Sequence, residues 1–98
     1  MASTKQLVES AIAENRIVIF SKSYCPYCQR AKGVLAKHPS LIYELDERDD
    51  GSDIQNYLAQ KTGQRTVPNI FIKQQHIGGS DDLAALERSG QLAKLLAA

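Results

Sequence analysis

Hydrophobic positions in the first quarter of the chain follow two different patterns, which predict a helix and then a strand. Between residues 3 and 14, apolar side chains recur at helical spacing behind the capping candidates Ser3 and Thr4. These apolar residues are Leu7, Val8, Ala11 and Ile12. The next run, RIVIF at residues 16–20, is rich in β-branched side chains and shows no alternation. This pattern is typical of a strand that is buried on both faces.

The middle of the chain predicts a second helix, a second strand and a third helix. Residues 26 to about 37 suit a helix, because a proline fits the first helical position and an apolar stripe follows it. The stripe consists of Ala31, Val34 and Leu35. The run LIYELD, residues 41–46, is typical of a strand. Ser52 can cap a helix that extends to Thr62, with Gly63 just past its end.

The last third predicts two short strands and two helices. NIFIKQQHI, residues 69–77, is compatible with a hairpin whose tight turn lies near Gln74 and Gln75. Residues 80–98 predict a capped helix and a last helix, divided by a Ser-Gly break at residues 89 and 90. We therefore expect an α/β fold with a four-stranded sheet and about five helices.

Composition narrows the class of protein. With 98 residues, 43% of them hydrophobic, the chain suits one domain over residues 1–98 that buries a core without covalent help. The formal charge is +1 and the signs are interleaved, so we expect no nucleic-acid partner. Charged residues interrupt the first 20 positions and no apolar run is long enough to cross a membrane. We therefore expect no membrane association and a cytoplasmic location, where thiols stay reduced.

The chain's two cysteines, Cys25 and Cys28, allow three interpretations: a structural disulfide, a zinc site or a redox-active pair. A reducing compartment disfavours a structural disulfide. Zinc needs about four ligands, and the chain adds only His38 and His76, neither at ligand spacing. Because a CxxC pair beside a βαβ pattern is typical of redox proteins, we favour redox chemistry and expect no metal.

The position of the pair explains how it could act. Cys25 lies where a buried strand meets a helix N-terminus, and Lys22 precedes it by three residues. Unpaired N–H groups, the helix dipole and a nearby lysine each favour a thiolate at this position. Cys28 lies at i+3 on the same helical face, about 5 to 6 Å away, which is within disulfide range. Pro26 stiffens the ring that such a disulfide would close.

Three motifs resemble those of a dithiol glutaredoxin. They are CPYC at 25–28, TVPNIFI at 66–72 and IGGSDDL at 77–83, in that family's order and spacing. The resemblance extends from about Arg16 to the C-terminus. Thioredoxins share the fold, but their signature is CGPC after a tryptophan, and this chain has no tryptophan. The resemblance implies a thioredoxin-like fold of the glutaredoxin type, with a four-stranded mixed sheet flanked by about five helices.

The resemblance also implies that glutathione is the reductant and co-substrate, and that it binds beside Cys25. The Val67–Pro68 bond would be cis, and the Val67 backbone would pair with the cysteinyl part of glutathione. At the N-terminus of the next helix, Ser80 and Asp81 would bind the γ-glutamyl end. The glutathione-binding residues implied in this way are Lys22, Tyr27, Gln55, Gln64, Arg65, Thr66, Val67, Pro68, Gly79, Ser80 and Asp81.

The other end of glutathione would be held by cations. Lys22 and Arg65 match family positions that bind the glycyl carboxylate. Gln55 and Gln64 are weaker candidates, and Tyr27 matches a position that stacks on the ligand. Each assignment has a simpler interpretation that stays open at this point. Exposed polar side chains are solvated by default, TVP suits an ordinary turn before a strand, and GGSDD suits plain helix capping.

These residues together predict a glutathione-dependent thiol–disulfide oxidoreductase. Cys25 would attack protein–glutathione mixed disulfides, and Cys28 would join in when the substrate is a protein disulfide. The expected partners are glutathione and glutathionylated or disulfide-bonded proteins, and the expected state is a monomer. The alternative is an iron–sulfur cluster dimer, with the first cysteine of each chain and two glutathiones as ligands. Pro26 argues against that alternative, because it stiffens the loop that would open toward a partner.

Overall fold

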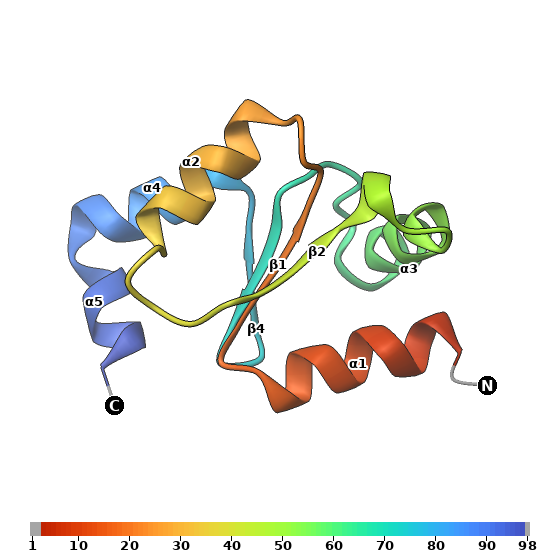
Figure 1. Ribbon diagram of the computed structural model, residues 1–98. Coiled ribbons are helices and arrows are strands. Elements are labelled where there is room, and N and C mark those ends of the chain that lie inside the picture. Colours follow the sequence, from red (N-terminus) through yellow and green to blue (C-terminus); the bar gives the residue numbers. More distant parts are fainter. Residues whose placement is uncertain (1–2, 98) are drawn as a thin grey trace.

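The computed structural model describes residues 3–97, which alternate between helices and strands as the sequence predicts (Figure 1). The elements in chain order are α1 (Thr4–Glu14), β1 (Ile17–Ser21), α2 (Pro26–Val34), β2 (Leu41–Glu44), a short 3-10 helix η1 (Leu45–Glu47), α3 (Gly51–Thr62), β3 (Asn69–Ile72), β4 (Gln75–Gly78), α4 (Ser80–Ser89) and α5 (Gln91–Leu96). Among the described residues, no helix is both long and apolar enough to cross a membrane.

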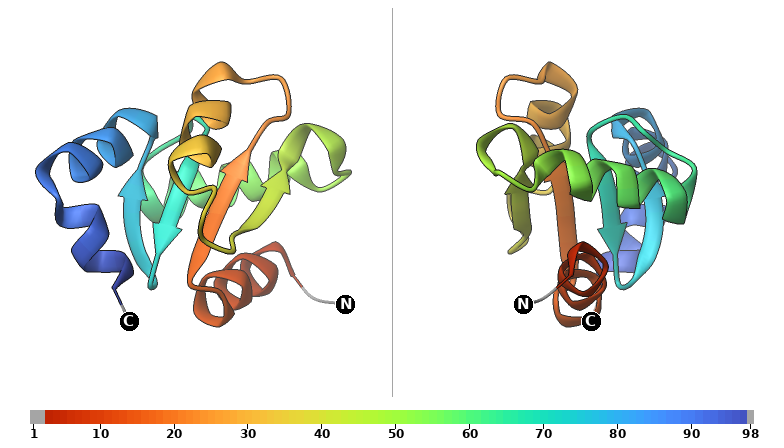
Figure 2. Two further views of the ribbon diagram at one scale, coloured as in Figure 1. Left: turned by 60° about the vertical axis from the view of Figure 1, so that its left-hand side comes forward. Right: turned by 90° about the vertical axis from the view of Figure 1, so that its right-hand side faces the viewer.

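The four strands form one mixed sheet in the order β2-β1-β3-β4. β1 pairs in parallel with β2, whereas β3 is antiparallel to both β1 and β4. This topology brings the C-terminal ends of β1, β2 and β4 and the N-terminal end of β3 to the same end of the sheet. Figure 2 shows this end opposite the β3–β4 turn. Loops that are far apart in the sequence therefore meet there. The predicted four-stranded mixed sheet with five α-helices is confirmed.

Helices cover both faces of the sheet, and β1 supplies side chains to both. Ile17 and Ile19 pack with α2, α4 and α5 on one face, while Val18 and Phe20 pack with α1 and α3 on the other. All five residues of β1 are buried. Burial on both faces is why this strand has no polar alternation, and the predicted buried strand is confirmed.

Capping residues explain the start of α1 and the ends of α3 and α4. Ser3 caps α1, because its hydroxyl accepts a hydrogen bond from the Gln6 N–H (3.0 Å) and the Gln6 side chain accepts one from the Ser3 N–H (3.1 Å). Gly63 and Gly90 end α3 and α4 in the left-handed conformation, with φ of 81° and 82°. Glycine adopts this conformation without steric cost.

The second helix is shorter than predicted. It ends at Val34 rather than near Lys37, because Leu35 leaves the helical conformation with φ −99° and ψ 10°. The chain then continues in turns, in which the His38 N–H donates to the Leu35 carbonyl (3.0 Å). Pro39 follows, and a helix rarely continues through the residue before a proline.

The predicted cap of the third helix is wrong. Ser52 lies inside α3, which begins at Gly51 after Asp50 at the N-cap position. Gly51 packs so closely on η1 that a Cβ would lie 1.9 Å from the Leu45 carbonyl oxygen. The predicted strand LIYELD is also too long, because it ends at Glu44 and the chain turns into η1. We attribute the start of α3 to the close packing of Gly51 on the Leu45 carbonyl rather than to a capping side chain.

The hairpin turn lies one residue earlier than predicted. Lys73 and Gln74 occupy it, with φ of 49° and 69°. Two consecutive positive φ values are those of a type I′ turn, which usually takes asparagine and glycine. Lys73 and Gln74 are unusual for this conformation, so the sequence lacks the Asn-Gly pair that usually marks such a turn.

Candidate active site

Cys25 occupies the N-cap position of α2, directly after the loop that leaves β1. Its backbone is extended (φ −85°, ψ 120°), Pro26 follows as the first helical residue, and the Cys25 carbonyl accepts the Gln29 N–H (3.1 Å). Cys25 is half-buried, whereas Cys28 is completely buried, and both are free thiols. The predicted placement of the pair on one turn of helix is therefore observed.

The pKa values of the two thiols are shifted in opposite directions. Partial burial acts to raise the pKa of Cys25, but hydrogen bonds from Cys28 and the Tyr27 backbone, with the charge of Lys22, bring that pKa below its ordinary value. Burial raises the pKa of Cys28, and the Cys25 thiolate raises it further. Hydrogen bonds to Cys28 from the Lys22 backbone and the Ser21 hydroxyl only partly offset this rise. Cys25 is therefore the thiol of the pair that ionises first, and Cys28 stays protonated to higher pH.

The loop before Cys25 is held by a carboxylate that the sequence did not single out. Asp46, in η1, accepts hydrogen bonds from the Ser23 N–H (2.9 Å) and from the Ser23 hydroxyl. The Gln29 side-chain amide donates to the Ser23 carbonyl (3.2 Å). The two hydrogen bonds from Ser23 lower the pKa of Asp46, so Asp46 stays ionised at neutral pH. The sequence shows only an acidic residue just after the second strand. Its place at the same end of the sheet as Cys25 follows from the parallel pairing of β2 with β1.

A second loop places its backbone against Cys25. The Val67–Pro68 peptide bond is cis, as the resemblance implies. The Val67 carbonyl oxygen lies 4.0 Å from the Cys25 sulfur. The side-chain amide of Gln64 donates to the carbonyls of Thr66 (3.0 Å) and Pro68 (2.9 Å), and this holds the loop in place.

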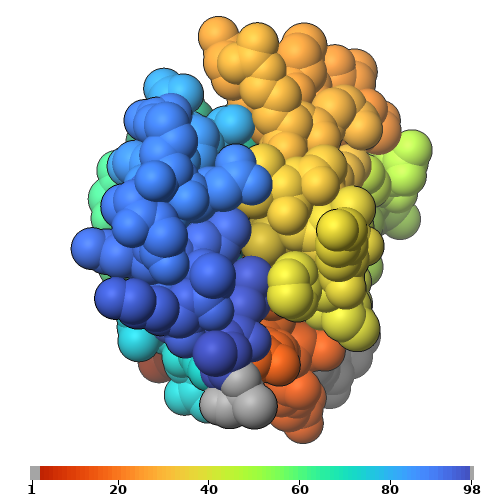
Figure 3. Space-filling model, turned by 90° about the vertical axis from the view of Figure 1, so that its left-hand side faces the viewer, coloured from red at the N-terminus to blue at the C-terminus, as the bar shows by residue number. Residues whose placement is uncertain are grey.

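A hollow of about 440 Å³ opens between the first turn of α2, this loop and the start of α4. Figure 3 shows α2 and α4 on either side of it. Its lining includes eight of the predicted site residues, together with Asp82. The eight are Tyr27, Gln64, Thr66, Val67, Pro68, Gly79, Ser80 and Asp81. Three elements that lie far apart in the chain thus form one site.

The start of α4 is capped by a residue that the sequence reasoning did not name. Asp82 accepts a hydrogen bond from the Gly79 N–H (2.9 Å), as an acid at the third position of a helix can do. Gly78 has φ 115°, and a Cβ there would lie 2.3 Å from the Asp82 carboxylate. Because Asp82 does the capping, the exposed carboxylate of Asp81 makes no hydrogen bond within residues 3–97. Plain capping therefore accounts for Asp82 and not for Asp81.

Three predicted ligand residues do not line the hollow: Lys22, Gln55 and Arg65. Lys22 precedes Cys25, and its charge acts on the Cys25 thiol. The Gln55 side-chain amide donates to the Arg65 carbonyl (2.7 Å), so it holds the loop on which Arg65 is exposed. Within the described residues, no cluster of three or more His, Cys, Asp and Glu side chains could hold a metal ion.

Comparison with known proteins shows the family. The sequence model of the glutaredoxin family matches residues 17–77. Glutaredoxin-1 of Rhizophagus irregularis is 52% identical, over 100% of this chain and 99% of that protein. Glutaredoxin-2 of Schizosaccharomyces pombe is also 52% identical, over 95% of this chain and 86% of that protein. The structure of a buckwheat glutaredoxin–glutathione complex matches with a TM-score of 0.92 and 42% identity, and the match covers 95% of this chain and 86% of that one. The chain therefore belongs to the glutaredoxin family of glutathione-dependent thiol–disulfide oxidoreductases.

Proposed function

We propose that this protein reduces protein–glutathione mixed disulfides through Cys25, with glutathione as the reductant. One observation carries the proposal: the Cys25 sulfur lies 4.0 Å from the carbonyl of Val67, a residue that lines the hollow leading to the start of α4. The similar buckwheat glutaredoxin forms a complex with glutathione. This supports glutathione as the occupant of the hollow, with its sulfur directed at Cys25.

The hollow suits the cysteinyl and γ-glutamyl parts of glutathione. The Val67 backbone can pair with the cysteinyl unit as an added strand would. Beyond it, the N–H groups of Ser80 and Asp81 face an incoming carboxylate at the N-terminus of α4, where the helix dipole also favours an anion. The Asp81 carboxylate, which capping leaves unused, can take the adjacent ammonium.

The glycyl end of glutathione would lie toward the cations on the opposite side. Lys22 and Arg65 can each bind its carboxylate. Gln55 and Gln64 act on the loop rather than first on the ligand, because their side-chain amides already donate to backbone carbonyls of residues 65, 66 and 68. We assign them to holding that loop in the conformation that binds glutathione.

The reaction is a pair of thiol–disulfide exchanges. The Cys25 thiolate attacks the glutathione sulfur of the mixed disulfide, a Cys25–glutathione bond forms, and the substrate thiolate leaves and takes a proton from water. A second glutathione thiolate then attacks the glutathione sulfur of the adduct and releases glutathione disulfide and the Cys25 thiolate. In the net reaction one glutathione thiol is consumed: its sulfur joins the glutathione of the mixed disulfide, and the substrate sulfur returns to the thiol level. A lowered pKa favours the last step, because Cys25 is then the better leaving group.

Cys28 enters when the substrate is a protein disulfide. Cys25 then forms a mixed disulfide with the protein, and Cys28 displaces that protein to close the Cys25–Cys28 disulfide, which glutathione reduces. Because this cycle consumes reduced glutathione, we also propose that the protein acts in a reducing compartment such as the cytoplasm. We further propose that it acts as a monomer. No observation on the described residues favours the iron–sulfur alternative.

Turnover of a glutathionylated peptide tests the proposal. The reaction is coupled to glutathione reductase, and the loss of NADPH is recorded at saturating glutathione. We expect turnover by the unchanged protein and a loss of at least about 100-fold in Cys25→Ser, because serine is a far weaker nucleophile than a thiolate. Turnover that survives in Cys25→Ser would refute the proposed role of Cys25. Activity that depends on thioredoxin reductase instead of glutathione would refute the choice of reductant.

A further inference from the structure

Two exposed aromatic side chains flank the reactive cysteine, and only one of them belongs to the glutathione hollow. Among the described residues, the large hydrophobic side chains that are exposed are Tyr24 (71%), Tyr27 (55%) and Ile42 (40%). Tyr27 lines the hollow, whereas Tyr24 does not. Tyr27 also has the Arg30 guanidinium over its ring at 5.5 Å. Within residues 3–97, the Tyr24 ring has neither an aromatic nor a cationic neighbour of this kind.

The backbone that carries Tyr24 is held firmly although its ring is exposed. On one side of it, the N–H, hydroxyl and carbonyl of Ser23 are all hydrogen-bonded, by Asp46 and Gln29. On the other side, the Cys25 N–H donates to the Lys22 carbonyl (3.1 Å) and closes a turn around Ser23 and Tyr24. An aromatic ring with few rotatable bonds on a fixed backbone loses little entropy when a partner covers it.

A mixed disulfide has two halves, and the site described so far accommodates one of them. If glutathione occupies the hollow, the substrate polypeptide is bonded to the glutathione sulfur and must extend from it out of the hollow. Tyr24 is the residue next to Cys25 and lies outside the hollow. A single exposed tyrosine needs no special explanation. An exposed, unpartnered ring on the residue that directly precedes the reactive cysteine differs, because every protein substrate must approach that cysteine.

We propose that Tyr24 contacts the polypeptide half of the mixed disulfide and favours substrates with an aromatic or branched apolar side chain next to the glutathionylated cysteine. This inference rests on the proposed function and names its substrate class. The first exchange is unchanged: Cys25 bonds to the glutathione sulfur and the substrate thiolate leaves, while the polypeptide around that thiolate contacts Tyr24. Tyr24 takes no part in bond making and acts as a specificity-determining contact.

Three glutathionylated probes test the inference. Two are short peptides that differ only before the modified cysteine, where one has tryptophan and the other serine. The third is the mixed disulfide of glutathione and cysteamine, which has no polypeptide half. We expect the unchanged protein to favour the tryptophan peptide about tenfold in kcat/KM, as the loss of one aromatic contact would predict. Tyr24→Ala should reduce this preference to within about twofold, and Tyr24→Phe should keep it.

A second measurement separates recognition from damage to Cys25. The rate of Cys25 alkylation by iodoacetamide as a function of pH should be the same in Tyr24→Ala and the unchanged protein, and so should turnover of the cysteamine probe. Equal kcat/KM for both peptides, or an equal loss on all three probes in Tyr24→Ala, would overturn the inference and leave the proposed function intact. Failure of the unchanged protein to turn over any of the probes would overturn the proposed function itself.

Discussion

The Asp46 carboxylate binds both the backbone N–H and the hydroxyl of Ser23, and so ties the loop before the reactive cysteine to the end of the neighbouring strand. Its partner lies 23 residues earlier in the chain. Since the pKa of Asp46 is lowered, mainly by the Ser23 side chain, the carboxylate keeps these bonds at neutral pH. The bonds are lost only in acid, as pH falls through the lowered pKa.

This contact predicts that Asp46→Ala loosens the loop without unfolding the protein. The Ser23 amide should exchange with solvent about tenfold faster, because its acceptor is gone. Turnover should fall as well, since Cys25 and Lys22 lie on the same loop. Hydrogen exchange followed by NMR measures the first effect and the coupled assay the second. Ser23→Ala, which removes only the hydroxyl bond, should change both less. Unaltered exchange of the Ser23 amide in Asp46→Ala would contradict this role.

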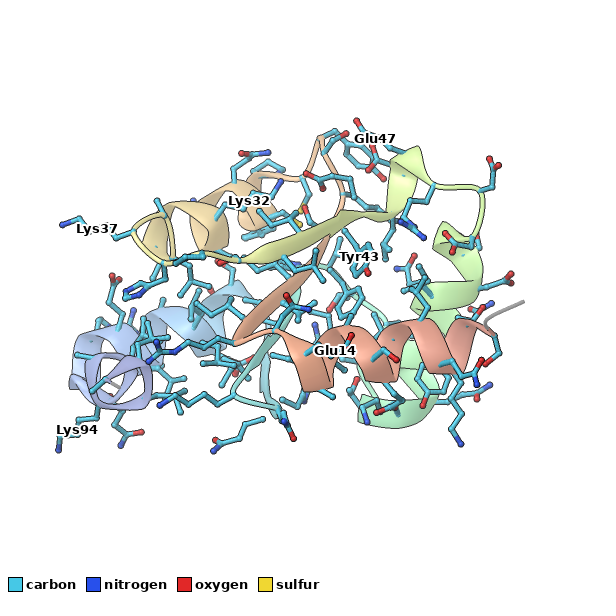
Figure 4. All side chains as sticks on the ribbon, turned by 60° about the horizontal axis from the view of Figure 1, so that its bottom comes forward. Glu14, Lys32, Lys37, Tyr43, Glu47 and Lys94 are labelled. Atoms are coloured by element: carbon cyan, nitrogen blue, oxygen red, sulfur yellow. The ribbon has the colours of Figure 1, made fainter. Side chains whose placement is uncertain are left out.

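The opposite pKa shifts of the two cysteines predict selective alkylation. At pH 7 iodoacetamide should modify Cys25 and leave Cys28 intact, and the rate should fall as pH falls through the lowered pKa of Cys25. Lys22→Met should move this profile to higher pH, because it removes a positive charge that favours the thiolate. Lys37→Met is the matched control, since Figure 4 shows Lys37 extending into solvent away from the sheet. A shift in the control as large as that in Lys22→Met would exclude a specific role for Lys22.

The two proposed reaction routes differ in whether they need the Cys28 thiol. Cys28→Ser should keep reduction of a glutathionylated peptide within about threefold, because Cys25 and two glutathiones complete that cycle. The same variant should lose reduction of a protein disulfide, since the resolving thiol is missing. Both substrates are measured in the coupled assay with one preparation of the variant. Loss of both activities would show that Cys28 takes part in the first exchange.

The ion pair between α2 and β2 predicts a cost to stability when only one partner is removed. Lys32 Nζ lies 2.5 Å from Glu44 Oε2, the two side chains are 19% and 23% exposed, and Glu44 Oε1 is buried without a hydrogen bond. Figure 4 shows Lys32 on α2 alongside β2. Lys32→Met should lower the free energy of unfolding by about 2 kcal/mol, because it leaves a largely buried carboxylate unpaired. Urea denaturation measures the loss.

A double variant tests the same pair. Adding Glu44→Leu to Lys32→Met should recover most of the lost stability, since the unpaired charge is then removed as well. A loss below about 0.5 kcal/mol in Lys32→Met alone would show instead that the pair behaves like an exposed one.

The hairpin turn predicts that a glycine stabilises the protein. Gln74 has φ 69°, a conformation that costs a non-glycine residue about 1 kcal/mol. Gln74→Gly should therefore raise the free energy of unfolding by about 0.5 to 1 kcal/mol. Its neighbour Gln75 begins β4, where glycine has no such advantage, so Gln75→Gly should lower stability by a similar amount. Urea denaturation of both variants, with opposite signs expected, checks the assignment.

Much of the site could be predicted from the sequence because its parts are local. The apolar run in β1 is buried on both faces, and Cys25 takes the N-cap position that the following proline indicates. The cis bond before Pro68 and the segment at Ser80 came from motif resemblance, and the structure brings both to one hollow. Neighbours in the chain are sufficient to indicate the strand and the N-cap position, whereas the cis bond follows only from the resemblance.

Contacts across elements could not be predicted in the same way. Asp46 meets Ser23, and Lys32 meets Glu44, because β2 lies parallel to β1 in one register. Strand order and register are properties of the whole sheet, and no local pattern encodes them. The wrong start of α3 has a separate reason, the close packing of Gly51 on the Leu45 carbonyl, which no capping residue indicates.

Residue types and their order along the chain identify the groups that carry the chemistry: a cysteine at a helix N-terminus, a second thiol one turn away, and the TVP and GGSD motifs of the glutathione site. The arrangement of these groups in space follows from the folded sheet. The antiparallel β3 brings Val67 to the Cys25 sulfur. Burial raises the pKa of Cys28, whereas hydrogen bonds and the Lys22 charge lower that of Cys25, and the two nearby tyrosines divide between a hollow and an open surface. Side-chain type is written in the chain, whereas burial and proximity arise only when the sheet has formed.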